Sequence, residues 1–183
     1  NKKNLVVIAW LAVSTMMSAQ SVYPGQHRIT HKLEEQYNNE FNFFFYIITG
    51  KPINKQNIRG YCGITMNKTG YIYKRYISDP NHIVHYLRDK EIWIGRFSEK
   101  KKYKREEIEL CKTMLISYWQ PELNKEKKSY YPNECITIVN RWFKPSFEAR
   151  EKCIYTAQTI PDLIIYDGKS IWGTDKIRKL KDL

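Results

Sequence analysis

The residues whose types and spacing could do chemistry are mainly cationic. Lys74-Arg75 lies among tyrosines, and a nearly continuous basic run follows at 100–105, which contains Lys100, Lys101, Lys102, Lys104 and Arg105. The chain of 183 residues has 31 Lys and Arg against 19 Asp and Glu, a net charge of +12. Each phosphate that such cations neutralise releases condensed counterions, which drives binding. The composition therefore favours a polyanion as partner, with nucleic acid first and an anionic membrane surface second.

Five residues stand in an ordered set along the chain. Tyr46 closes Phe44-Phe45-Tyr46, Tyr61 opens Tyr61-Cys62-Gly63, and Arg75 follows in the basic segment. Lys112 lies three residues before Leu115-Ile116, and Asn124 closes Pro121-Glu122-Leu123-Asn124. Each has an ordinary structural interpretation: the tyrosines as core residues, Arg75 as a surface charge and Asn124 as a turn residue. These residues are distinguished by their order along the chain and by the type of secondary structure expected at each position.

This ordered set resembles the GIY-YIG nuclease family over about residues 41–124. The family pattern runs GIY, YIG, an Arg on the first helix, a Glu three residues before a Leu-Ile pair, and a Pro-x-x-Asn. The resemblance implies an α+β fold, with a small antiparallel three-stranded sheet flanked by helices. It also implies hydrolysis of phosphodiester bonds in double-stranded DNA with one divalent metal ion, Mg²⁺ or another, as cofactor.

Carried onto this chain, the resemblance implies a catalytic set of Tyr46, Tyr61, Arg75, residue 112 and Asn124. Tyr46 would act on the attacking water, while Tyr61 and Arg75 would position and neutralise the phosphate. The basic residues Lys74, Lys100, Lys101, Lys102, Lys104 and Arg105 are expected to contact DNA. A metal ion and a guanidinium stabilise the charge that develops on the phosphodiester oxygens.

Lys112 departs from the pattern, because the family has its metal-binding Glu at this position. An ammonium group cannot ligate Mg²⁺, which takes oxygen ligands. Glu109, one helical turn earlier, is the alternative carboxylate. Smaller departures are Phe44-Phe45 before the first tyrosine and Asp79 one turn after the arginine. We therefore expect a nuclease in an inactive form, and the alternative is a natural pseudo-nuclease that only binds DNA.

Hydrophobic periodicity predicts the elements that must position this set. Apolar and β-branched runs predict a strand over 41–49, a hairpin partner over 61–65 and a third strand over 91–98. The segment 67–78 is expected to be helical. Apolar residues spaced by three or four predict a helix over 105–119, which a proline ends.

The first 40 residues are expected to form helices. Residues 5–20 are nearly apolar all round, as in a buried helix, and 26–39 indicate a second short helix. The run 5–13 also fits the outline of a signal peptide, which would make the chain a secreted nuclease or toxin. A membrane anchor is a third alternative, although the run is shorter than the ~20 apolar residues that a span needs.

After residue 128 the chain continues into further β structure. Residues 134–143 alternate like a strand, 145–152 should form a short helix, and 162–173 predict a β-hairpin. We therefore divide the chain into an N-terminal helical extension (1–40), a nuclease core (41–128) and a C-terminal strand and hairpin extension (129–183). Such a chain resembles the free-standing GIY-YIG type II restriction endonucleases. Cutting both strands with one site per chain then implies a dimer or higher homo-oligomer.

The four cysteines are widely spaced: Cys62, Cys111, Cys135 and Cys153. No pair forms the C-x-x-C of a zinc site or redox motif. We expect four free thiols in the reducing environment of the cytoplasm, with no membrane partner, and two disulfides are the alternative.

Overall fold

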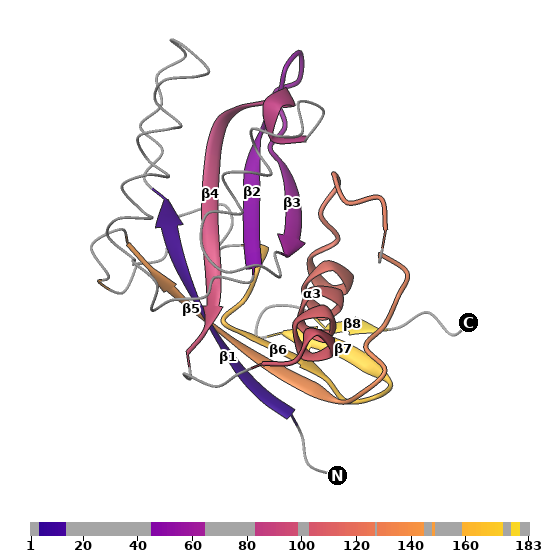
Figure 1. Cartoon of the computed structure of the whole chain (residues 1–183). Helices are drawn as coiled ribbons and strands as arrows, with labels where there is room; N and C mark the ends of the chain where they lie inside the picture. The colour runs from indigo at the N-terminus through magenta and orange to yellow at the C-terminus, as the bar shows by residue number, and fades with distance from the viewer. Residues whose placement is uncertain are drawn as a thin grey trace.

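The computed structural model describes residues 4–13, 45–64, 83–98, 103–126, 128–144, 148, 159–173 and 177–179. Within these ranges the chain forms one mixed eight-stranded sheet, and a long helix, α3 (Arg105–Trp119), packs against it (Figure 1). The strands are β1 (Asn4–Val13), β2 (Phe45–Pro52), β3 (Arg59–Ile64), β4 (Leu87–Phe97), β5 (Ile136–Phe143), β6 (Leu163–Tyr166), β7 (Ser170–Gly173) and β8 (Ile177–Lys179). A 3-10 turn, η1 (Ile83–Tyr86), precedes β4.

The strands follow the order β3-β2-β4-β1-β5-β6-β7-β8 across the sheet. β1 and β5 pair in parallel, and the other neighbouring strands pair antiparallel. In Figure 1 the β2–β3 turn and the start of β4 lie at one end of the sheet, and α3 begins near the end where β4 stops. The hairpin that carries Tyr46 and Tyr61 therefore forms the edge of a large sheet.

This architecture corrects the predicted small three-stranded sheet flanked by helices. β2, β3 and β4 are antiparallel neighbours, but the sheet continues from β4 through β1 into the C-terminal strands. The predicted N-terminal helix is wrong over 4–13, because β1 fills the place between β4 and β5. An apolar run fits a strand buried on both faces as well as a buried helix, and the β-branched Val6, Val7 and Ile8 favour the strand.

Other predicted elements agree with the structure where it describes them. α3 has the predicted bounds, and β2 with β3 forms the predicted antiparallel hairpin. The β6–β7 hairpin is also confirmed, and its turn depends on Asp167, whose Oδ1 accepts the N–H groups of Lys169 and Ser170 at 2.8 Å each. These bonds hold the pKa of the Asp167 carboxyl below its usual value. The helices predicted over 26–39 and 67–78, and nearly all of 145–152, lie outside the described residues.

The main core lies between α3 and one face of the sheet. α3 contributes the apolar side chains of Ile108, Cys111, Met114, Leu115 and Ile116. Across the sheet, Trp10 of β1 stacks on Trp142 of β5 with ring centroids 5.5 Å apart, and Trp93 of β4 meets Trp142 edge-on. Gly95 lies under the Trp10 ring, since a Cβ there would come within 2.7 Å of ring atoms. Large rings on β1 and β5 therefore pack over the smallest residue of β4.

Asn140 is the buried polar residue that joins β5 to its neighbours. Its Oδ1 accepts the indole N–H of Trp10 at 2.8 Å, and its Nδ2 donates to the carbonyl of Pro161 at 2.9 Å. Its backbone N–H donates to the carbonyl of Asp162 at 2.7 Å. One side chain thus fixes β1, β5 and the approach to β6 relative to one another.

Replacing Asn140 by Ala should therefore destabilise the protein. The change leaves the Trp10 N–H and the Pro161 carbonyl buried without partners, so we expect the free energy of unfolding to fall by about 2–4 kcal/mol. Urea unfolding of the full chain measures this loss. Asn133→Ala at an exposed bend is the matched control and should change stability by less than about 0.5 kcal/mol. Equal losses in the two variants would contradict the role of Asn140.

Candidate nucleic-acid site

Tyr46 and Tyr61 lie on the same face of the β2–β3 hairpin. Tyr46 is paired with Gly63, and Ile48 with Tyr61, so the two phenol rings are diagonal neighbours with centroids 5.9 Å apart. A Cβ at Gly63 would overlap the Tyr46 ring, which therefore rests directly on the β3 backbone. The Tyr-x-Gly spacing is thus explained, because the glycine makes room for the first tyrosine beside the second.

The two phenols differ in access to solvent. Tyr46 is 3% exposed and packs with Ile48 and Leu87. Tyr61 is half-buried against the same cluster, with Leu123 alongside. Tyr61 is therefore the phenol that a ligand on this face would meet first, and Tyr46 supports it from beneath.

Asn124 holds the outer edge of β3. Its Oδ1 accepts the backbone N–H of Cys62 at 2.8 Å, and its Nδ2 donates to the carbonyl of the same residue at 2.8 Å. Leu123 donates its N–H to the carbonyl of Gly60 at 3.1 Å, and the Glu122 carboxylate accepts the N–H of Gly60 at 3.1 Å. Residues 122–124 thus bind the backbone of Gly60 and Cys62 at the free edge of β3, as a neighbouring strand would. We call this arrangement the edge clasp.

The edge clasp makes Asn124 a positioning residue. Its amide uses a donor and an acceptor on the backbone of Cys62, the residue next to Tyr61. A turn asparagine and a catalytic asparagine were both compatible with the sequence. In the structure the side chain contacts the strand that carries the tyrosine, and it acts on any ligand through that strand.

Lys112 lies on α3, which packs against the face of β3 opposite to the two tyrosines. The thiol of Cys62 belongs to the core under α3, whereas Tyr61 belongs to the opposite face. Burial raises the pKa of Cys62 to about 12, and the nearby Lys112 ammonium acts in the opposite direction. A Cβ at Gly60 would overlap the Trp119 ring, which shows how closely α3 sits on β3. Lys112 therefore belongs to the α3 side of the hairpin, and the two phenols to the other.

The residues present do not fit a Mg²⁺ site at position 112. An ammonium repels a divalent cation, and among the described residues no group of three His, Cys, Asp or Glu side chains is placed to hold a metal ion. The alternative carboxylate, Glu109, is also on α3 and so comes from the same side as Lys112.

The other predicted contacts are only partly within the described structure. Arg75, Lys74 and Lys100–Lys102 lie outside the described residues. Lys104 and Arg105 are exposed at the start of α3, where Glu106 and Glu107 follow directly, and the Glu107 carboxylate accepts the backbone N–H of Lys104 at 2.8 Å. Local acids thus offset the two described cations of the predicted DNA-binding loop.

A second set of cations was missed by sequence reasoning. Lys51, Lys55 and Arg59 border the β2–β3 turn, and Arg88 and Lys90 stand at the start of β4. These cations do not form a continuous basic run in the sequence, and the segments that contain them are typical of a polar connection or the end of a strand. The antiparallel pairing of β2 with both β3 and β4 brings them to one end of the sheet.

No protein-family model, curated protein or solved structure matches the chain. Within the described ranges, no helix is long and apolar enough to cross a bilayer. The placement of the side chains is therefore the basis on which function is argued.

The edge clasp can be tested by two substitutions at one position. Asn124→Ala removes both partners of the Cys62 backbone, so we expect a loss of about 2–4 kcal/mol in unfolding free energy. Asn124→Asp keeps the acceptor but turns a carboxylate oxygen toward the Cys62 carbonyl, so its loss should be at least as large. Urea unfolding, together with amide hydrogen exchange at Cys62, measures both. Unchanged stability and unchanged exchange at Cys62 in Asn124→Ala would contradict the two-bond clasp.

Thiol reactivity checks the burial of Cys62 and Cys111. Burial raises the pKa of both thiols, and Glu107 raises that of Cys111 further, so neither forms much thiolate near neutral pH. We expect iodoacetamide at about pH 8.5 to modify Cys135 before Cys62 and Cys111 in the folded protein, and these three cysteines at similar rates in urea. Peptide mass spectrometry assigns the modified sites. Early labelling of Cys62 in the folded protein would contradict the described core.

Proposed function

We propose that this chain binds double-stranded DNA at the Tyr46–Tyr61 face of the β2–β3 hairpin and does not cleave it. The observation that carries the proposal is the convergence of Tyr46, Tyr61 and Asn124. The three come from separate parts of the sequence, yet the tyrosines share one face of the hairpin and Asn124 binds the backbone of β3, the strand that carries Tyr61. Three members of the ordered set that resembles a nuclease motif thus lie together at the hairpin, whereas Lys112 lies on the α3 side.

The charge and the cysteines support the same class of function. A net charge of +12 favours binding to phosphates in a salt-dependent way. Cys62, Cys111 and Cys135 are free thiols, which fits a reducing compartment such as the cytoplasm. A homodimer would place one such face on each half of a duplex, in keeping with the two-fold symmetry common among DNA-binding proteins.

The second candidate is a type II restriction-like endonuclease that Lys112 holds inactive. Its support is that a single position, 112, removes the expected metal ligand. Against it stands the placement of α3, because a carboxylate at 112 would come from the Cys62 side of β3 rather than from the phenol side. The geometry therefore favours binding without cleavage.

Duplex binding and cleavage can be measured on the same preparations. We expect fluorescence anisotropy with a labelled duplex of about 20 base pairs to show binding that weakens steeply between about 50 and 200 mM salt. Neither the unchanged protein nor Lys112→Glu should nick supercoiled plasmid with Mg²⁺. Lys112→Gln is the control for charge loss without a carboxylate. Absence of binding at the lowest salt would refute the proposal, and Mg²⁺-dependent nicking by Lys112→Glu alone would establish the second candidate.

Tyr61, the more accessible of the two phenols, allows a more local test. Tyr61→Phe removes one hydroxyl and keeps the ring, so we expect duplex affinity to fall by about 0.5–1.5 kcal/mol, or roughly two- to twelve-fold. Tyr130→Phe is the matched control, because Tyr130 is 67% exposed on the loop after α3. Equal affinities for the two variants would remove Tyr61 from the binding surface.

A further inference from the structure

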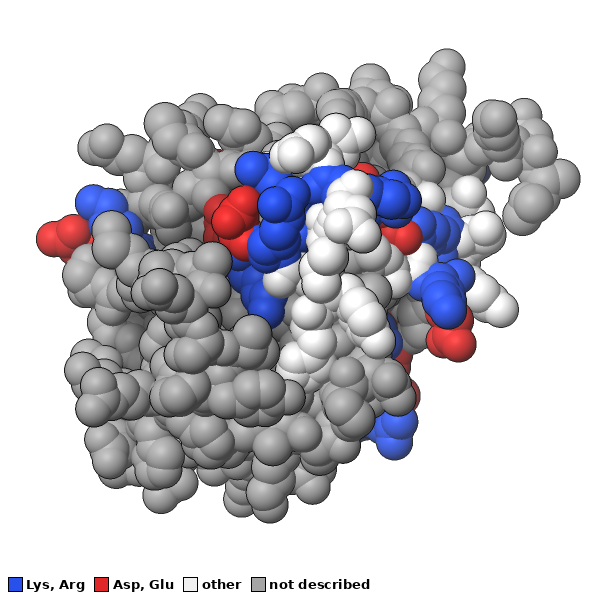
Figure 2. All heavy atoms as spheres, turned by 90° about the horizontal axis from the view of Figure 1, so that it is seen from above, with Lys and Arg blue, Asp and Glu red and all other residues white. Residues whose placement is uncertain are grey.

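Cations from three adjacent strands meet at one end of the sheet. Figure 2 looks down on this end and shows Lys and Arg side chains gathered there. We define the basic end as Lys51, Lys55, Arg59, Arg88 and Lys90. It lies apart from Lys104 and Arg105, which follow β4 at the opposite end of that strand.

Backbone pairing holds the basic end together. Gly50 pairs with Arg59 of β3, and Lys51 with Arg88 of β4. A Cβ at Gly50 would come within 2.8 Å of the Arg88 carbonyl and 3.5 Å of the Lys90 Cα, so the strands approach closely at this point. The register shifts between Thr49 and Lys51, and such a bulge turns the following side chains to new directions.

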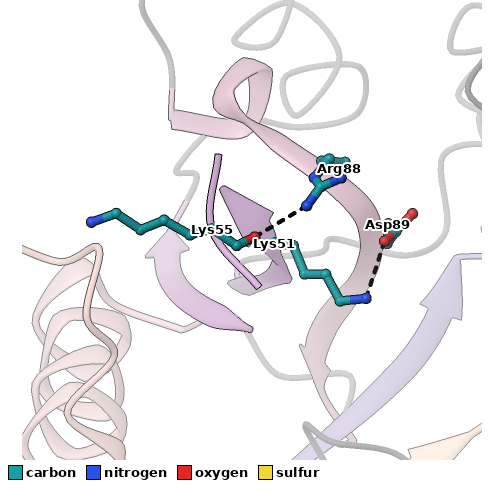
Figure 3. Close-up of polar contacts among 4 residues, drawn as sticks. All are labelled: Lys51, Lys55, Arg88 and Asp89. Atoms are coloured by element: carbon teal, nitrogen blue, oxygen red, sulfur yellow. Dashed lines mark hydrogen bonds and ion pairs between the residues drawn. The ribbon is translucent and has the colours of Figure 1, made fainter. Parts of the chain in front are cut away.

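Side-chain contacts then fix two of the cations. The Arg88 guanidinium donates to the carbonyl of Lys55 at 3.2 Å, and the Lys51 ammonium lies 3.4 Å from Asp89 Oδ2 (Figure 3). Asp89 sits on the bulge with φ 48°, a left-handed conformation that Asp tolerates better than most residues. The turn itself is tied to η1, because Ile53 donates its N–H to the carbonyl of Tyr86 at 3.1 Å.

The acids near this end offset only part of its charge. Two carboxylates lie in the same segments, those of Asp89 and Glu91. The Glu91 carboxylate accepts the indole N–H of Trp93, and the exposed Glu122 carboxylate accepts the N–H of Gly60 beside Arg59. Asp89 and Glu122 are thus the acids that face the five cations. Lys55 and Arg88 are both exposed. Among the described residues, this end therefore presents an excess of positive charge on a rigid frame.

We infer that the basic end binds the phosphate backbone of the same DNA duplex that meets Tyr61. This inference rests on the proposed function and names the surface that supplies its affinity. Arg59 precedes Tyr61 by two residues on β3, so their side chains leave the same face about 7 Å apart. A backbone lying on the basic end therefore passes beside the exposed phenol.

The dimensions of the surface fit a short stretch of one DNA strand. Three neighbouring β-strands span about 10 Å between the outer two, and a DNA strand has one phosphate per about 3.4 Å of helix axis. About three phosphates thus lie across β3, β2 and β4. Tyr86, 50% exposed beside Arg88, adds a hydroxyl of the kind that bonds phosphate oxygens. A surface of cations and hydroxyls contacts the phosphates of the backbone and carries no information about base sequence.

The test neutralises the two exposed cations of the basic end. In Lys55→Gln/Arg88→Gln we expect the slope of log affinity against log salt for duplex DNA to become shallower by about 1.8, or 0.9 per lost contact. Lys90 is left unchanged because it is half-buried, and burial lowers its pKa. The matched control is Arg141→Gln/Lys169→Gln, which removes one exposed Arg and one exposed Lys from β5 and the β6–β7 turn. Thermal unfolding verifies that both variants fold.

Each outcome separates this inference from the proposed function. A shallower slope in the basic-end variant but not in the control supports the inference. A slope equal to that of the unchanged protein, or equal changes in both variants, overturns it while duplex binding itself stands. Loss of binding to phosphatidylserine vesicles with duplex binding unaltered also overturns it, because the partner would then be a membrane surface. If the unchanged protein binds no duplex, the proposed function fails as well.

Discussion

The fold around the hairpin depends on the edge clasp of β3 by residues 122–124. An edge strand presents unpaired N–H and C=O groups, and here the groups of Gly60 and Cys62 find partners in Glu122, Leu123 and Asn124. The chain can reach this edge because α3 ends in a left-handed residue, Gln120, at φ 55° and ψ 49°. Its side-chain amide donates to the carbonyls of Ser117 and Lys128, so both ends of the loop are fixed to the helix. The hairpin, α3 and the loop after it therefore form one unit.

Within that unit, β3 lies between the α3 core on one face and the tyrosine cluster on the other, and a glycine on each face makes room for an aromatic ring. Gly60 admits the Trp119 ring on the α3 side, and Gly63 admits the Tyr46 ring on the other. Cys62 faces the core and Tyr61 the opposite cluster. Because side chains of a strand alternate between faces, α3, which packs on the Gly60 and Cys62 side, lies opposite the two phenols. This alternation decides where Lys112 acts.

Several local elements could be predicted from the sequence, but their assembly into one sheet could not. α3 was predicted to the residue because its apolar spacing and Pro121 are both local signals. β1 was mistaken for a helix, since an apolar run carries no period and its partner β5 lies far along the chain. Asn124 was predicted as a site residue, and its contact with the Cys62 backbone depends on the register of β3, which the sequence does not reveal. The basic end was missed because pairing of β2 with two strands, and not proximity in sequence, brings its cations together.

The charge at position 112 bears on binding as well as on catalysis. A carboxylate that holds no metal repels phosphate, whereas an ammonium attracts it, and the difference is two units of charge. Charges act over about 8–10 Å at moderate salt, so a cation on α3 beside Cys62 still contributes to the potential around the edge of β3. Lys112 therefore adds to the positive potential on the α3 side of this strand. The proposed binding of a polyanion thus gains support from the lysine at position 112, on the opposite side of β3 from the two phenols.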